Sequence, residues 1–220
     1  MLQIYGTLGP ACSDTETLIQ LFQAGMSGVR LNLSHIGLPG AAEQIEHLHA
    51  AARRCNVTPQ LLIDMQGPEL RVGVLPSPLS LKTGTHVRLG EDIPLPPAIL
   101  PHLLPGQEVL LDDGRLLLRV SRSLPGGALA LVERGGILQS RKSAALPGVD
   151  IHLPAITDSD RLNLRLAKDY GVTGVMQPFV RGKEDLKAVR QVLDADGGQA
   201  VRLFAKIENL DGVNKLAELI

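Results

Sequence analysis

The sequence has few aromatic residues, few cysteines and almost no net charge. Of its 220 residues none is Trp and only 2% are aromatic, so it lacks the stacking surfaces of single-strand nucleic-acid binders. Lys and Arg (22) balance Asp and Glu (23), and a net charge of −1 gives no electrostatic footprint for nucleic acid or an anionic membrane. Two cysteines, Cys12 and Cys55, are too few for a disulfide framework. The partner class that remains is a small molecule.

Long apolar runs are also absent, and we expect no secretory leader. No stretch reaches the length of about 20 apolar residues that a membrane helix needs. No charged segment followed by an apolar run opens the chain, so we expect a cytoplasmic protein without a membrane partner. With 44% hydrophobic and 20% charged residues, the chain can bury an aliphatic core.

Short apolar segments alternate with helical patterns in the first 71 residues. Strand-like segments cover residues 2–8, 28–34 and 60–66. The first helical pattern begins at Ser13 and Glu16, which have the spacing of a capping box, and the second covers residues 40–54. Such alternation predicts an α/β fold with a parallel sheet.

Residues 72–147 have a different composition. They contain nine of the 15 prolines and no long helical period, which predicts an inserted β-rich domain. Its clearest strands are residues 115–120 and 128–133, expected to be antiparallel neighbours joined by the turn at Pro125-Gly126-Gly127.

The alternating pattern resumes in residues 148–220. A helix capped at Thr157 carries Leu162, Leu166 and Tyr170 and ends at Gly171. Strands over residues 175–180 and 201–207, and helices over 183–193 and 211–220, follow. Residues 1–71 and 148–220 together have room for about five βα units at roughly 30 residues each.

Polar side chains share one face at the ends of three predicted strands. In the second strand Arg30, Asn32 and Ser34 alternate with apolar residues; Asp64 and Gln66 do so in the third, and Lys206 and Glu208 in the fifth. Barrels of parallel strands place their active sites at these carboxyl ends. Opposite charges together with carboxylate, amide and hydroxyl oxygens favour a site for phosphate and metal ions.

Several separate strings, in chain order, resemble those of the pyruvate kinase family. They are Thr7-Leu8-Gly9-Pro10-Ala11, Arg30-Leu31-Asn32-Leu33-Ser34-His35, Asp64-Met65-Gln66-Gly67-Pro68-Glu69-Leu70-Arg71, Gly136-Ile137-Leu138-Gln139-Ser140-Arg141-Lys142, Leu146-Pro147-Gly148, Phe179-Val180-Arg181 and Lys206-Ile207-Glu208-Asn209. The ordered set is far more specific than any one string.

The resemblance implies a (β/α)₈ barrel of the TIM type with an inserted, small β-barrel-like cap domain at residues 72–147. It implies transfer of a phosphoryl group from phosphoenolpyruvate to ADP, giving pyruvate and ATP in glycolysis, with Mg²⁺ (or Mn²⁺) and K⁺ as cofactors. Glu69 stands where potassium-dependent members usually keep Glu.

The resemblance also assigns expected roles to single residues. Arg30 and Lys206 would contact the phosphoryl group, Arg71 would support the site, and Asn32 and His35 would lie near the substrate or nucleotide. Glu208 would hold Mg²⁺. The expected K⁺ ligands are the side chains of Asn32, Ser34 and Asp64 and the carbonyl of Met65.

The sequence departs from the family at a few positions. Gln66 replaces a usual Lys, His152 a usual Asp, Ser143-Ala144-Ala145 a usual Gly-Val-Asn and Gln177-Pro178 a small Ala-Ser pair. Because later family strings are missing, we expect the amino-terminal part of a pyruvate kinase, as a homo-oligomer or with its carboxyl-terminal half missing. Two alternatives stay open: a short non-catalytic paralogue that binds phosphate ligands or a partner, and a chain whose remaining strands come from a separate chain.

Overall fold

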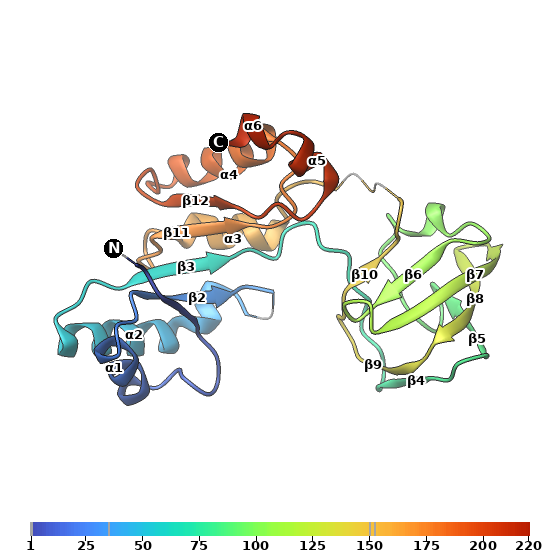
Figure 1. Cartoon of the computed structure of the whole chain (residues 1–220), viewed down its shortest axis with the longest axis horizontal. Helices are drawn as coiled ribbons and strands as arrows, with labels where there is room; N and C mark the ends of the chain where they lie inside the picture. The colour runs from blue at the N-terminus through green and yellow to red at the C-terminus, as the bar shows by residue number, and fades with distance from the viewer. Residues whose placement is uncertain (1, 35, 150, 152) are drawn as a thin grey trace. The chain divides into compact units, whose positions relative to one another are not determined.

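A computed structural model describes residues 2–34, 36–149, 151 and 153–220 of the chain. The chain divides into two compact units (Figure 1). The first unit comprises Met1–Pro68 and Pro154–Ile220, and the second comprises Glu69–Leu153.

A five-stranded parallel sheet forms the centre of the first unit. Its strands lie in the order β1-β2-β3-β11-β12, with every neighbouring pair parallel. Their bounds are β1 Tyr5–Thr7, β2 Gly28–Asn32, β3 Gln60–Asp64, β11 Gly174–Gln177 and β12 Arg202–Ala205. This confirms the α/β class and the parallel sheet, which ends at β1 and β12.

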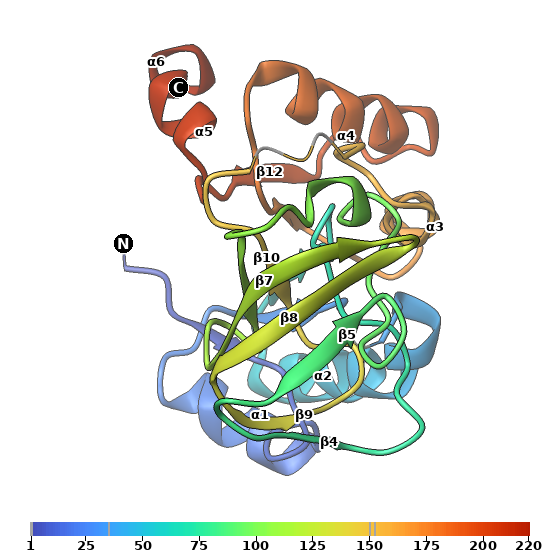
Figure 2. The same ribbon diagram turned by 90° about the vertical axis from the view of Figure 1, so that its right-hand side faces the viewer.

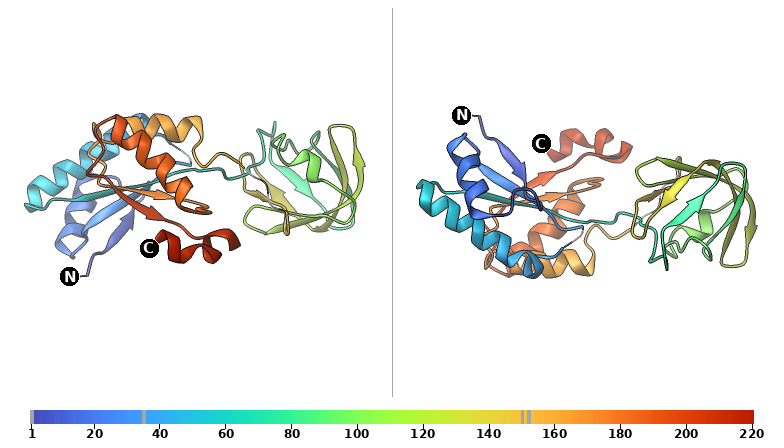
Figure 3. Two further views of the ribbon diagram at one scale, coloured as in Figure 1. Left: turned by 90° about the horizontal axis from the view of Figure 1, so that it is seen from above. Right: turned by 90° about the horizontal axis from the view of Figure 1, so that it is seen from below.

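Helices between these strands bury apolar side chains against the sheet, and two short helices follow β12. Figure 3 shows the twisted strands with the long helices α2 and α4 beside them. The helices are α1 Thr15–Gln23, the 3₁₀ turn η1 Leu38–Ala41, α2 Ala42–Cys55, α3 Asp158–Leu166, α4 Lys183–Ala195, α5 Leu210–Asn214 and α6 Leu216–Leu219. One cluster of buried side chains from β2, β3, β11 and α1 to α4 is the core of the unit.

The alternation expected in β2 and β3 is confirmed. Leu31 and Ile63 are 2% and 0% exposed and belong to the core, whereas Arg30 and Asn32 point to the other face and are only half-buried. Asp64 also lies on the other face, yet it is 3% exposed. A carboxylate buried to this degree requires charged or hydrogen-bonding partners.

Three helix predictions need correction. The cap of α1 is Asp14, which accepts from the Thr17 N–H at 2.9 Å, while Glu16 instead pairs with Arg54 of α2. Helix α3 ends at Leu166, and its expected apolar Leu162 is 56% exposed.

The last predicted helix is also divided. In place of one helix over residues 211–220, the chain forms two short helices, α5 and α6, which meet at Lys215.

The second unit is an antiparallel β structure with its own apolar core. One sheet has the order β10-β6-β7-β8-β5, and β4 pairs with β9. The bounds are β4 Leu79–Leu81, β5 His86–Leu89, η2 Leu100–His102, β6 Glu108–Leu111, β7 Leu116–Leu124, β8 Gly127–Arg134, β9 Gly136–Leu138 and β10 Ala144–Ala145. The predicted antiparallel pair is confirmed, because β7 and β8 lie side by side and join at Pro125-Gly126 (Figure 2).

No helix in the described part of the chain is both long enough and apolar enough to cross a membrane.

Candidate active site

Arg30 and Asp64 form an ion pair across neighbouring strands of the first unit. The Arg30 Nε and Nη2 atoms lie 2.9 Å and 2.5 Å from Asp64 Oδ2, and the Arg30 Nη1 donates to Thr7 Oγ1 at 3.3 Å. The pairing follows from the register of the parallel strands, in which β2 and β3 present these side chains on the same face. The sequence pattern did not predict the contact between Thr7 and Arg30.

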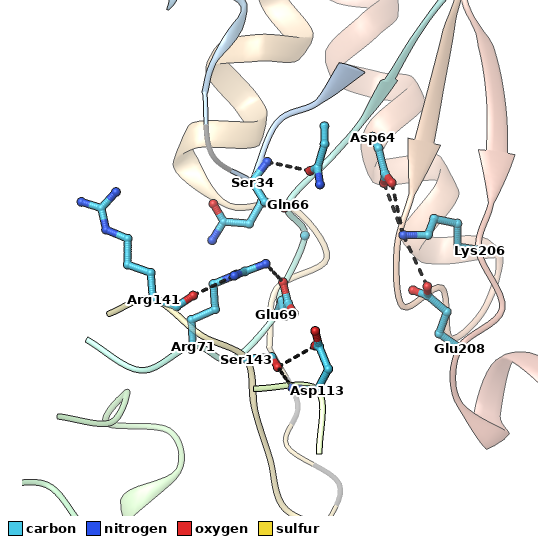
Figure 4. Close-up of polar contacts among 12 residues, drawn as sticks. Ser34, Asp64, Gln66, Glu69, Arg71, Asp113, Arg141, Ser143, Lys206 and Glu208 are labelled. Atoms are coloured by element: carbon cyan, nitrogen blue, oxygen red, sulfur yellow. Dashed lines mark hydrogen bonds and ion pairs between the residues drawn. The ribbon is translucent and has the colours of Figure 1, made fainter. Parts of the chain in front are cut away.

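Lys206 joins the same carboxylate from the loop after β12. Its Nζ lies 3.3 Å from Asp64 Oδ1 and 3.4 Å from Glu208 Oε1 (Figure 4). We call Arg30, Asp64, Lys206 and Glu208 the charged cluster. Its two cations are 31% and 28% exposed at their side chains, so they are accessible to an anion, whereas Asp64 is only 4% exposed.

The backbone of Phe179 holds Glu208. The Phe179 N–H donates to Glu208 Oε2 at 3.1 Å, and Phe179 has φ of 54°, a left-handed conformation that is uncommon for a residue other than glycine. Glu208 is therefore fixed on one oxygen by a backbone donor and lies beside Lys206 on the other. The pattern of the sequence gave no sign of this contact.

Asn32 and Ser34 form a turn where β2 ends. The Ser34 N–H donates to Asn32 Oδ1 at 3.0 Å, and Asn32 stands directly across from Asp64 in the strand register. Met65 follows Asp64, and its side chain is 2% exposed within the apolar core. The four residues expected to hold K⁺ thus lie at two adjacent strand ends. His35, which was expected near the nucleotide, lies outside the described residues.

Arg71 belongs to the second unit. Its Nη2 lies 2.5 Å from Glu69 Oε2, and its Nη1 donates to the carbonyl of Arg141 at 2.7 Å. The buried Nε of Arg71 has no hydrogen-bond partner among the described residues. In the same unit the Ser143 hydroxyl donates to Asp113 Oδ1 at 2.8 Å (Figure 4). His152, another departure from the family pattern, lies outside the described residues.

The residues present have the chemistry of hard-cation ligands. Among the residues that the structure describes, no three His, Cys, Asp or Glu side chains gather as a metal site. The expected K⁺ donors are carboxylate, amide, hydroxyl and carbonyl oxygens, which are the ligands that hard cations take. Mg²⁺ is commonly bound by one or two carboxylates together with substrate phosphates and water, so Glu208 fits that role.

Comparisons with known proteins give the same family along the whole chain. A family model described as "Pyruvate kinase, barrel domain" matches residues 1–220. Pyruvate kinase of Geobacillus stearothermophilus is 31% identical over 230 residues, covering 99% of this chain and 39% of the relative. Human pyruvate kinase PKLR is 32% identical over 239 residues, covering 99% and 42%.

The pyruvate kinase of Methylorubrum extorquens is 34% identical over 229 residues, covering 99% of this chain and 47% of the relative. The chain therefore spans less than half the length of these curated relatives. Because the family model covers every residue of it, the chain belongs to the pyruvate kinase family.

Proposed function

We propose that this chain supplies part of the active site of a pyruvate kinase, which transfers the phosphoryl group of phosphoenolpyruvate to ADP. One observation carries the proposal: the partly exposed cations Arg30 and Lys206 converge on the buried carboxylate of Asp64. Phosphoryl transfer needs mainly positioning and positive charge beside the equatorial oxygens of the transferred group. Two cations held at neighbouring strand ends meet that need.

Each member of the charged cluster has a separate role in this proposal. Arg30 and Lys206 contact the phosphoryl oxygens, and Lys206 opposes the charge that develops during transfer. Asp64 holds both cations in place before substrate arrives, which reduces the reorganisation needed at the moment of reaction. The contact of His35 with nucleotide and the supporting role of Arg71 rest on the family resemblance.

Two kinds of metal ion complete the proposed site. Glu208 would hold Mg²⁺, which neutralises charge on the transferring group when it is bound. Asn32, Ser34, Asp64 and the carbonyl of Met65 would hold K⁺. Their oxygen donors, and the turn that the Ser34 N–H forms with Asn32 Oδ1, support this assignment.

We propose further that the parallel sheet is part of an eight-stranded barrel of the TIM type, and that residues 72–147 are its β cap. Apolar side chains after β12 support a larger fold, because Leu210, Val213 and Leu216 are 79%, 55% and 43% exposed. The relatives, which are more than twice as long, support it independently.

Replacing Lys206 by Ala tests the proposed reaction. In the protein expressed from its complete gene, this substitution should lower kcat for pyruvate formation from phosphoenolpyruvate and ADP about 10²- to 10³-fold. The change in KM should be smaller. Lys187→Ala is the matched control, since Lys187 is an exposed lysine of α4 paired with Glu184. A Lys206→Ala variant with unchanged kcat would contradict the assigned role.

A non-catalytic paralogue remains the second candidate. Gln66 favours it, because the family usually has a positive charge at this position and the glutamine supplies none. Calorimetry with phosphoenolpyruvate separates the two functions: binding without any pyruvate formation at millimolar substrate supports the paralogue.

A further inference from the structure

Helix α3 carries two buried polar side chains on its inner face. Asp160 is 1% exposed and Asn163 is 2% exposed, and they lie one turn apart. Burial of a carboxylate or an amide is costly unless hydrogen bonds replace water. Their partners therefore explain why this helix buries two polar side chains beside the apolar Leu164, which is 1% exposed.

Asp160 does more than cap its own helix. It accepts from the Thr157 N–H at 3.0 Å, and its own N–H donates to Thr157 Oγ1 at 3.0 Å, which completes the capping box. It also accepts from the N–H groups of Gln66 and Gly67, each at 3.1 Å, in the loop that leaves β3. A capping box needs only the first pair of contacts, so the second pair has another purpose.

Asn163 holds the loop that leaves β2 in the same way. Its Oδ1 accepts from the Leu38 N–H at 2.8 Å, 125 residues away in sequence, while its Nδ2 donates to the carbonyl of Ser159 at 2.9 Å. Both ends of the amide are thus used, and the loop is tied to α3 through a single oriented oxygen.

The two tethered loops are those that follow the proposed K⁺ ligands. Asn32 and Ser34 precede the loop held by Asn163, and Asp64 and Met65 precede the loop held by Asp160. The separation of ligands in a cation site decides which ion fits, because selectivity depends on cavity size and ligand flexibility.

We infer that Asp160 and Asn163 are positioning residues that fix the separation of the two loops and thereby the preference of the site for K⁺. The inference rests on the proposed function, because K⁺ binding at these strand ends is part of it. Neither side chain touches the cation; each acts through the backbone that carries its ligands. Groups that orient metal ligands typically change affinity by about 10- to 100-fold when they are replaced.

Amide hydrogen exchange tests the hydrogen bonds of Asp160 and Asn163 to the two loops directly, without any enzymatic turnover. In the naturally made protein, Asp160→Asn should speed exchange of the Gln66 or Gly67 amide, because an amide group offers one acceptor oxygen where the carboxylate offers two. Asn163→Leu should speed exchange at Leu38, whereas Asn163→Asp, which keeps the acceptor, should leave Leu38 protected. Unchanged exchange at all three amides would overturn the inference.

Cation-dependent melting tests the selectivity. The K⁺ concentration that gives half-maximal thermal stabilisation should rise about tenfold in Asp160→Asn, and the preference for K⁺ over Na⁺ should narrow. The Mg²⁺ concentration that gives half-maximal thermal stabilisation should stay unchanged. Asp158→Asn is the control, since it removes the same charge from an exposed position of the same turn.

The outcomes separate the inference from the proposed reaction. The positioning role would be overturned if the half-maximal concentrations of K⁺ and Mg²⁺ rose equally in the variant. It would also be overturned if K⁺ did not stabilise the unmodified protein. If K⁺ stabilises the unmodified protein and the variants lose that response, but no pyruvate forms, the inference stands and the proposed reaction fails.

Discussion

Replacing Asp64 by Asn removes the charge that two cations share and keeps the size of the side chain. In the native protein Arg30 and Lys206 both contact this carboxylate, which is almost inaccessible to water. In the variant the two cations remain close together without a counter-charge. We therefore expect a loss of stability and a new sensitivity to anions.

The distances set the size of the effect. Lys206 Nζ lies 3.3 Å from Asp64 Oδ1, an attraction of about 5 kcal/mol at an effective dielectric constant of about 20. The cost of burying Asp64 offsets much of this attraction, and removing one partner of a buried pair typically costs about 3–5 kcal/mol. Because Arg30 and Lys206 are partly exposed and gain hydration, we expect the low end, about 3 kcal/mol.

Urea unfolding monitored by circular dichroism measures the loss of stability as a lower midpoint concentration of urea, with no change in the slope of the unfolding free energy against urea concentration. Asp169→Asn is the control, since Asp169 is an exposed aspartate of the same unit. Added inorganic phosphate should recover more stability in Asp64→Asn than in the unmodified protein, because it replaces the missing charge. If the Asp64 variant matches the Asp169 control, or if phosphate stabilises both proteins equally, the carboxylate does not hold the two cations.

Two further predictions concern pH and backbone geometry in the same unit. Burial alone would raise the pKa of Asp185, but hydrogen bonds from the side chain and N–H of Arg181 outweigh it and lower the pKa below its ordinary 3.8. The ion pair should therefore stabilise the fold above the ordinary pKa of 3.8 and lose that contribution as the pH falls through the lowered pKa. In Asp185→Asn, the free energy of unfolding should therefore fall less steeply at acid pH than in the unmodified protein. An equally steep fall would contradict this. Gly67→Ala should lower stability by about 2 kcal/mol or more, since φ is +62° and a Cβ would lie 2.4 Å from Pro178 Cγ. Gly171→Ala in the same unit, with φ of +70° and no atom nearer its Cβ than the His49 ring at 3.4 Å, should cost less in the same urea measurement, and equal costs would refute the steric argument.

Regular periods in the sequence predicted the elements that shape the candidate site. A period of two separated Leu31 and Ile63 from Arg30 and Asp64, because each side of a strand meets a different environment. This was enough to place the charged cluster at the strand ends. The family strings then added expected roles that spacing alone does not carry.

Contacts between distant segments could not be predicted in the same way. The apolar period identifies the inner side of α3 only in part. Leu166 and Tyr170 pack against the core as expected, whereas Leu162 is exposed. The buried face also contains Asp160 and Asn163, which the period does not include. Their partners are backbone groups of Gly67 and Leu38, and backbone groups have no sequence signature. An Asp at the third position of a capping box was the one available signal, and it indicates only the local contact.

The position of the second unit within the chain has a consequence for folding order. Strand β3 pairs with β11, although Leu62 and Gly174 are about 110 residues apart, which makes this pairing slow and entropically costly. Near its two ends the second unit holds itself together, since the Val72 N–H donates to the carbonyl of Lys142 at 2.8 Å and its apolar core is its own. If that unit folds first, the loop to be closed shrinks to a few tens of residues, and closure becomes about 1 kcal/mol less unfavourable. During biosynthesis, early folding of the second unit would then shorten the chain separation between β3 and β11 before these two strands pair.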